Sequence, residues 1–299
     1  MGKTKEALRV SALGIAANTA LSLLKLLAGV FAGSAAMVSD AVHSMSDVAS
    51  SVIAMAGQKT SSRQDANHSY GLERMESAAA VALSGVLFFV GAGIGYAGLE
   101  QLMPGRGELE APGVLAAIAA IVSIGAKEAL CWYTMAKAAK YNSTGLMAEA
   151  KHHRTDAWSS IGSLAGILGA RMGVPLLDPV ASVVISIFVV KDAIEIFMKS
   201  ISQVTDKACE PETEEAMRAV ASSVDGVMSV DLLKTRLFGD KIYVDLEIGA
   251  QESMPLSQTH AIAESARSHV EKAFPEVKSC MVHVNPVCEI EGEIELENK

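Results

Sequence analysis

The chain has 299 residues, of which 50% are hydrophobic and only 5% aromatic, and its formal net charge is -9. So high an apolar content is typical of a membrane protein rather than of a soluble enzyme of this length. The acidic balance argues against nucleic acid as a partner, because phosphate binding needs basic patches that this chain lacks.

Six apolar segments are each long enough to cross a hydrocarbon core of about 30 Å at about 1.5 Å per residue. We expect them at residues 8–31, 36–57, 77–99, 112–136, 146–170 and 176–199. Basic residues such as Lys3, Lys59 and Lys137 gather beside alternate ends of the segments. The positive-inside rule therefore places both termini in the cytoplasm. The sequence predicts a multi-pass protein of the cell (inner, or cytoplasmic) membrane, surrounded by the lipid bilayer.

Small residues are frequent inside the segments, for example from Gly33 to Ala36 and from Gly91 to Gly95. Small side chains let helices approach closely where lipid offers no hydrophobic drive for association. A compact bundle of six transmembrane helices is therefore expected.

Two motifs of the form HxxxD lie in the second and fifth segments, one from His43 to Asp47 and one from His152 to Asp156. Residues four apart share one face of a helix, so two packed helices would bring two imidazoles and two carboxylates together. That set matches the tetrahedral nitrogen and oxygen shell that zinc accepts. Ionisable groups inside a membrane span are rare and usually functional, so we interpret these residues as a metal transport site rather than as packing contacts.

Two further groups accompany this site. Asp40 lies one turn before the first motif and is predicted to orient a ligand or to lie on the ion path. The loop after the second segment holds Asp65 and His68. These two residues are a candidate loop metal site, whose alternative is an ordinary solvated loop.

Histidine ligands also provide a mechanism for coupling. An imidazole binds metal only when it is neutral, so metal binding releases protons and protonation expels metal. A site exposed in turn to two compartments of different proton potential would therefore exchange metal for protons.

After residue 204 the composition becomes that of a soluble module. We expect a helix at residues 210–223, strands at 227–237 and 241–248, a helix at 256–273 and a strand at 277–284. The order α-β-β-α-β predicts a small α+β domain with an open sheet covered by helices. About 80 residues are marginal for independent stability, which favours a dimer. We divide the chain into a transmembrane domain (1–204), a cytoplasmic domain (205–288) and an acidic tail (289–299).

Four residues of the cytoplasmic domain form a candidate regulatory metal site as a set, although each alone is typical of a protein surface: Asp231, Asp245, His260 and His283. The four cysteines of the chain have no zinc-ribbon spacing and are interpreted as reduced thiols.

The stretch from Gly33 to Asp47, the pattern DxxHSYG that begins at Asp65, the pair Lys127 and Glu128, and the stretch from Glu149 to Ser160 resemble the cation diffusion facilitator family. The C-terminal part is similar to the ferredoxin-like, or metallochaperone-like, domain of that family. The resemblance covers nearly the whole chain. It implies a homodimer with six spans per protomer that exports a divalent metal from the cytoplasm in exchange for protons by alternating access.

By the same resemblance, His43, Asp47, His152 and Asp156 are the transport ligands of a zinc-type member. Leu72 stands where some members have another loop histidine, and Asn285 replaces a carboxylate of the cytoplasmic domain. The resemblance further implies a charge contact between Arg74 and Asp206.

Several alternatives remain open. The ligand set favours Zn²⁺, as substrate and as regulator, only modestly over Fe²⁺, Mn²⁺ or Co²⁺. A non-transporting membrane metal sensor or scaffold would carry the same ligands. An intramembrane zinc hydrolase would need an open coordination position and a catalytic base, as in HExxH, and that motif does not occur. We therefore expect a cation/proton antiporter and not an enzyme.

Overall fold

The computed structural model describes residues 2–60, 68, 72, 74–103, 109–141, 143–238 and 241–288. It divides into two compact units. The first comprises Met1–Leu72 and Ala78–Lys199, and the second comprises Glu73–Ser77 and Ser200–Lys299. The acidic tail predicted at residues 289–299 lies outside the described residues.

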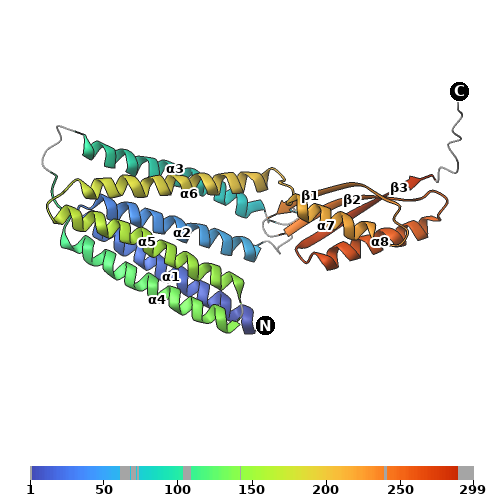
Figure 1. The fold of residues 1–299 in the computed structure, drawn as a ribbon, viewed down its shortest axis with the longest axis horizontal. Coiled ribbons are helices and arrows are strands. Elements are labelled where there is room, and N and C mark those ends of the chain that lie inside the picture. The colour runs from blue at the N-terminus through green and yellow to red at the C-terminus, as the bar shows by residue number, and fades with distance from the viewer. Residues whose placement is uncertain are drawn as a thin grey trace, which may run out of the picture. The chain divides into compact units, whose positions relative to one another are not determined.

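The first unit contains long helices at each predicted apolar segment (Figure 1). They are α1 (Gly2–Phe31), α2 (Ala35–Thr60), α3 (Arg74–Leu102), α4 (Val114–Tyr141), α5 (Thr144–Arg171) and α6 (Leu177–Val204). Among the described residues, Arg9–Phe31 of α1, α3 and α4 are long and apolar enough to cross a membrane by length and composition. Polar and charged side chains interrupt α2, α5 and α6. That all six helices cross the bilayer stays a prediction.

Helices α1, α2, α4 and α5 pack against one another as a group of four (Figure 1). Their shared interior is rich in alanine, including Ala36 of α2 and Ala116 and Ala120 of α4, all of which are fully buried. Met37 and Ile167 fill the space between these small residues. Small side chains at the contacts allow the close helix approach that the sequence predicts.

Helices α3 and α6 lie side by side (Figure 1), and the glycines of α3 explain how. A Cβ atom at Gly95 would lie 2.6 Å from Ser186 Oγ, and one at Gly98 would lie 2.8 Å from Val183 Cγ2. A larger side chain at either position would therefore force Ser186 or Val183 of α6 to move. The glycine-rich stretch of α3 is therefore the surface that α6 packs on.

The beginning of α2 is held by α6. Ser34 Oγ donates a hydrogen bond of 2.6 Å to Asp178 Oδ1, and the backbone N–H of Ala35 donates one of 2.7 Å to Asp178 Oδ2. One turn further, the hydroxyls of Ser39 and Ser182 are 2.8 Å apart. The first N–H groups of a helix have no partner within it, and here a buried carboxylate of another helix accepts from two of them, those of Ala35 and Ala36.

The second unit has the element order that the sequence predicts. It contains α7 (Pro211–Ser222), β1 (Ser229–Phe238), β2 (Lys241–Gln251), α8 (Leu256–Ala273) and β3 (Val277–Val287). The strand order is β1-β2-β3. Strands β1 and β2 are antiparallel, whereas β2 and β3 are parallel and are connected through α8. Figure 1 shows α7 and α8 beside the sheet.

The core of the second unit lies between the sheet and its helices. Val244, Leu246 and Ile248 alternate along β2 and are fully buried, as period-two alternation requires of a strand with one covered face. They pack with Met217 of α7 and Val270 of α8. This core is separate from the alanine-rich interior of the helical unit.

Candidate metal site

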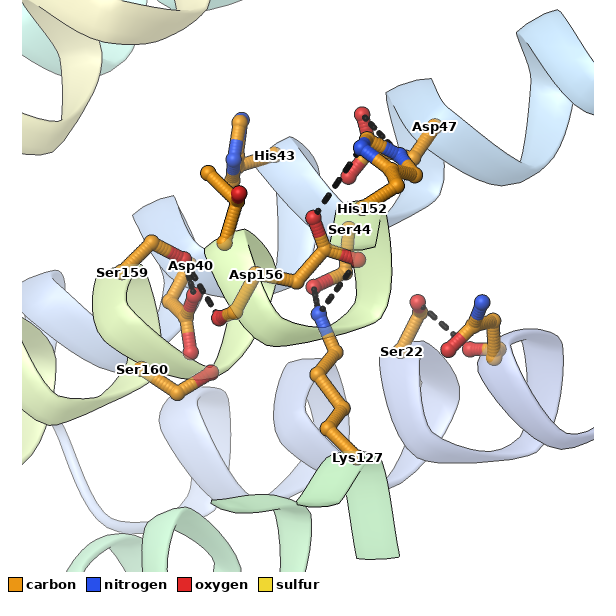
Figure 2. A network of polar contacts seen from close by, with 12 residues as sticks. Ser22, Asp40, His43, Ser44, Asp47, Lys127, His152, Asp156, Ser159 and Ser160 are labelled. Carbon is orange, nitrogen blue, oxygen red and sulfur yellow. Dashed lines mark hydrogen bonds and ion pairs between the residues drawn. The ribbon is translucent and has the colours of Figure 1, made fainter. Parts of the chain in front are cut away.

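The two HxxxD motifs face each other across the contact between α2 and α5 (Figure 2). Each motif occupies one turn of its helix, so both members project to the same side. His43 and Asp47 of α2 and Asp156 of α5 offer ligand atoms that all lie within 4.8 Å of one another. No other group of three or more histidine, cysteine, aspartate or glutamate side chains converges in this way in the described part of the chain.

His152 borders this group rather than closing it. Its Nε2 atom is 3.9 Å from Asp47 Oδ1 and its Nδ1 atom is 3.7 Å from Asp156 Oδ1. Its side chain is 50% exposed, whereas that of Asp156 is 2% exposed. An ion at this position would therefore have three ligands inside the bundle and one at its accessible edge.

Two atoms of this group have no hydrogen-bond partner in the described part of the chain. Asp47 Oδ2 and His43 Nδ1 are buried and have no hydrogen-bond partner among the described residues. Buried polar atoms are normally paired, and an unpaired one calls for an explanation. A bound cation between α2 and α5 would satisfy both atoms.

Asp192 of α6 is a neighbour of this group that the sequence analysis did not identify. Its Oδ2 atom is 3.4 Å from His43 Nδ1. The only signal in the sequence is a charged pair, Lys191 and Asp192, inside an apolar segment. The packing of α6 decides which of the two residues faces the site, and the sequence alone does not show that packing.

The partners of two buried lysines are the other feature that the sequence did not reveal. Lys25 of α1 forms an ion pair of 2.7 Å with Asp40, and Lys127 of α4 forms one of 3.2 Å with Asp156. Asp40 Oδ1 also accepts a hydrogen bond of 3.0 Å from Ser159 Oγ. Asp40 was expected to orient a ligand or to lie on the ion path; the structure pairs it with Lys25, and that role stays a prediction.

The remaining predictions concern a loop metal site and a charge contact. Asp65 lies outside the described residues, and His68 is exposed, so the candidate loop site stays a prediction. Arg74 donates a hydrogen bond to Asp206 within the second unit. The Arg74 guanidinium also lies 4.5 Å from the centre of the Phe238 ring.

The four candidate ligands of the cytoplasmic domain do not form one cluster. His260 and His283 line the same cavity of about 370 Å³ beside α8 and β3. Asp245 instead pairs with Arg236 at 3.3 Å. Asp231 accepts hydrogen bonds from Ser229 Oγ and Asn285 Nδ2, and these bonds lower the pKa of its carboxyl group.

Comparisons with known proteins show the family to which the chain belongs. The model of the cation efflux transmembrane domain matches residues 11–204, and that of the cation efflux protein cytoplasmic domain matches residues 209–287. The chain belongs to the cation efflux family, whose members export divalent metal cations. The cytoplasmic domains of this family are dimeric and bind divalent metals.

Several relatives align over most of this chain. Metal tolerance protein C1 of Arabidopsis thaliana is 32% identical over 94% of this chain and 63% of its own length. An uncharacterized transporter of Methanocaldococcus jannaschii is 31% identical over 92% of this chain and 96% of its own. The manganese efflux system protein MneP of Bacillus subtilis is 26% identical over 94% of this chain and 96% of its own. The chain thus spans less than two thirds of the length of the Arabidopsis protein.

Among solved structures, a cadmium form of the MamM CTD is 23% identical to this chain, with a TM-score of 0.25. The alignment covers 26% of this chain and 96% of the MamM CTD chain.

Proposed function

We propose that this chain exports a divalent metal cation, with Zn²⁺ as the favoured substrate, from the cytoplasm in exchange for protons. The observation that carries the proposal is the convergence of His43, Asp47 and Asp156, with His152 at the edge, inside a bundle of long apolar helices. Two imidazoles and two carboxylates suit zinc, and each imidazole can bind metal or a proton but not both.

The proposal includes the membrane arrangement and the assembly. All six helices α1 to α6 cross the inner, or cytoplasmic, membrane, both termini are cytoplasmic, and the protein is a homodimer that works by alternating access. The transmembrane domain comprises residues 1–204, the cytoplasmic domain residues 205–288, and the acidic tail residues 289–299. The family's dimeric cytoplasmic domain supports the assembly.

Zinc-dependent proton flux tests the proposal directly. The purified chain is reconstituted in liposomes that contain a pH-sensitive dye, and zinc is added outside. We expect His152→Ala and Asp47→Ala to abolish the flux, because each removes one ligand of the site. His269→Ala is the matched control, since His269 is an exposed residue of α8 outside every proposed site. Normal flux in Asp47→Ala would overturn the site assignment.

The pH dependence of binding tests the exchange. Zinc affinity of the detergent-purified chain should fall as the pH drops through the ordinary histidine range, since protons compete for the imidazoles. Equal affinity at mildly acidic and neutral pH would contradict a proton-coupled mechanism. Tight binding without any flux in liposomes would favour a metal sensor instead.

A second substrate has specific support. Asp192 adds a carboxylate 3.4 Å from His43, and a shell with more oxygen ligands suits Mn²⁺ or Fe²⁺ better than a shell of two imidazoles and two carboxylates. One relative is named as a manganese efflux protein. Competition of Mn²⁺, Fe²⁺ and Co²⁺ with zinc in the flux assay, in wild type and in Asp192→Asn, distinguishes these substrates.

The cavity beside His260 and His283 is proposed as the regulatory zinc position of the cytoplasmic domain, with Asp231 and Asp245 further away. Metal content of the wild type beside Asp47→Ala and His283→Ala separates the two sites. Each variant should lose only its own share of bound zinc.

A further inference from the structure

Lysine is almost never fully buried unless it is paired. The described part of this bundle contains two buried lysines, and both are paired. Lys25 is 0% exposed and Lys127 is 1% exposed. Both ammonium groups donate hydrogen bonds of 3.1 Å to the same acceptor, Ser44 Oγ. Figure 2 shows Lys127 extending from α4 to Ser44 and Asp156. The result is a buried row of charges from Asp40 to Asp156, with a carboxylate at each end and the two lysines between them.

The two lysines differ in what their carboxylates do. Asp40 Oδ2 pairs with Lys25 and Asp40 Oδ1 accepts a hydrogen bond from Ser159 Oγ, so each oxygen faces a partner inside the bundle. Asp156 instead belongs to the metal site, and Lys127 pairs with one of its oxygens, Oδ2. The other oxygen, Oδ1, faces His152 Nδ1 at 3.7 Å. Only Oδ1 is therefore available on the side where the cation would bind.

A fixed ammonium on the far side of a ligand has two consequences. It repels a divalent cation at a range of a few ångströms in a weakly screened interior, which lowers the affinity of the site. It also prevents Asp156 from binding an ion with both oxygens. Larger cations with many oxygen ligands use bidentate carboxylates, whereas a tetrahedral ion needs one oxygen from each.

We infer that Lys127 is a specificity-determining and release-promoting residue of the transport site. It holds Asp156 in a one-oxygen mode that favours small tetrahedral cations, and it keeps binding weak enough for the ion to leave. This inference rests on the proposed function. Lys127 acts through Asp156 and need not touch the ion itself.

Substitution of the charge tests the inference. Lys127→Gln keeps a hydrogen-bond donor for Ser44 and Asp156 but removes the positive charge. We expect the zinc Kd of the purified full chain to fall about tenfold. The maximal flux in liposomes should fall together with KM, because release becomes slower. The affinity for Mn²⁺ relative to Zn²⁺ should rise, since Asp156 can then offer both oxygens.

Two variants serve as controls. Lys127→Arg keeps the charge, and its zinc affinity should not exceed that of wild type. Lys140→Met removes the same charge from an exposed position of the same helix and should leave affinity and flux unchanged. If Lys127→Gln does not fold, Lys127→Arg still decides, because tighter zinc binding by that variant would overturn the inference.

The transport site and the role of Lys127 can be disproved separately. If wild-type chain and Asp47→Ala bind zinc equally, the transport site itself is wrong. If Asp47→Ala loses zinc but folded Lys127→Gln binds zinc as wild type does, or more weakly, only the role of Lys127 is wrong. A merely structural lysine would lower stability in Lys127→Gln without moving KM and the maximal flux in the same direction.

Discussion

The arrangement of each HxxxD motif was predictable because its spacing is a local property. A separation of four residues fixes His43 beside Asp47, and His152 beside Asp156, whatever the rest of the fold does. Lys127 and Asp192 could not be assigned in that way. Their partners come from other helices, so only the packing of α4 and α6 reveals them.

At the residue scale, Cys280 of β3 should make the second unit sensitive to alkali. Burial, with the charge of Glu271 second, raises the pKa of this thiol to about 12 from 9.0. Below pH 9 the thiol is protonated in both the folded and the unfolded chain, so it does not lower the free energy of unfolding. Between 9 and 12 only the unfolded thiol ionises, so the free energy of unfolding falls by up to about 1.4 kcal/mol per pH unit.

The infrared β-sheet band follows thermal unfolding of this unit in the full chain. We expect the midpoint of wild type to decrease more steeply between pH 8 and pH 10.5 than that of Cys280→Ala. Parallel curves for the two proteins would contradict a protonated, buried thiol.

At the element scale, the positions of the helices followed from apolar runs, but their pairing did not. The sequence showed that glycines are frequent, and the structure shows which of them are contacts. Gly91 and Gly95 pack against α6, whereas Gly93 between them has open space around it. A sequence pattern alone does not distinguish a glycine that a neighbouring helix requires from one that lies on a free surface.

Helix α5 offers a matched pair for testing this distinction. A Cβ at Gly166 would lie 2.4 Å from Ala181 Cβ and 3.0 Å from the Leu177 carbonyl oxygen, whereas nothing lies within 4 Å at Gly162. Gly166→Ala should therefore destabilise the detergent-solubilised protein by about 1–3 kcal/mol, the usual cost of overpacking. Gly162→Ala should be neutral or stabilising, because alanine is the better helix former. Equal melting temperatures for the two variants would contradict the close contact of α5 and α6.

At the scale of the whole molecule, the change of composition near residue 204 predicted a second module, and its α-β-β-α-β order was visible in the hydrophobic periodicity. The number of spans follows less directly from the sequence. Helices α1, α3 and α4 contain stretches apolar enough to cross a membrane, whereas α2, α5 and α6 carry more polar groups, among them the two HxxxD motifs and Asp192. The proposed function uses those polar groups, and they weaken the signal by which a span is recognised.

The native cysteines can determine which side of the membrane the second unit occupies. Cys288 is exposed, whereas Cys131, Cys209 and Cys280 are buried. A membrane-impermeant maleimide should label Cys288 in inside-out vesicles but not in intact cells, because we place the C-terminus in the cytoplasm. Cys288→Ser should remove the label. The reaction will need alkaline buffer, because the hydrogen bond to Glu252 raises the pKa of this thiol. Labelling in intact cells would reverse the proposed topology.

The carboxylate of Asp178 has a mechanical consequence for α2. It fixes one end of a helix of 26 residues, about 39 Å long at about 1.5 Å per residue. His43 lies about 12 Å from that fixed end. If α2 turns about this end by about 10°, His43 moves by about 2 Å while the opposite end moves by about 7 Å. A rotation that displaces His43 by no more than the length of one metal–ligand bond therefore displaces the far end of α2 roughly three times as far.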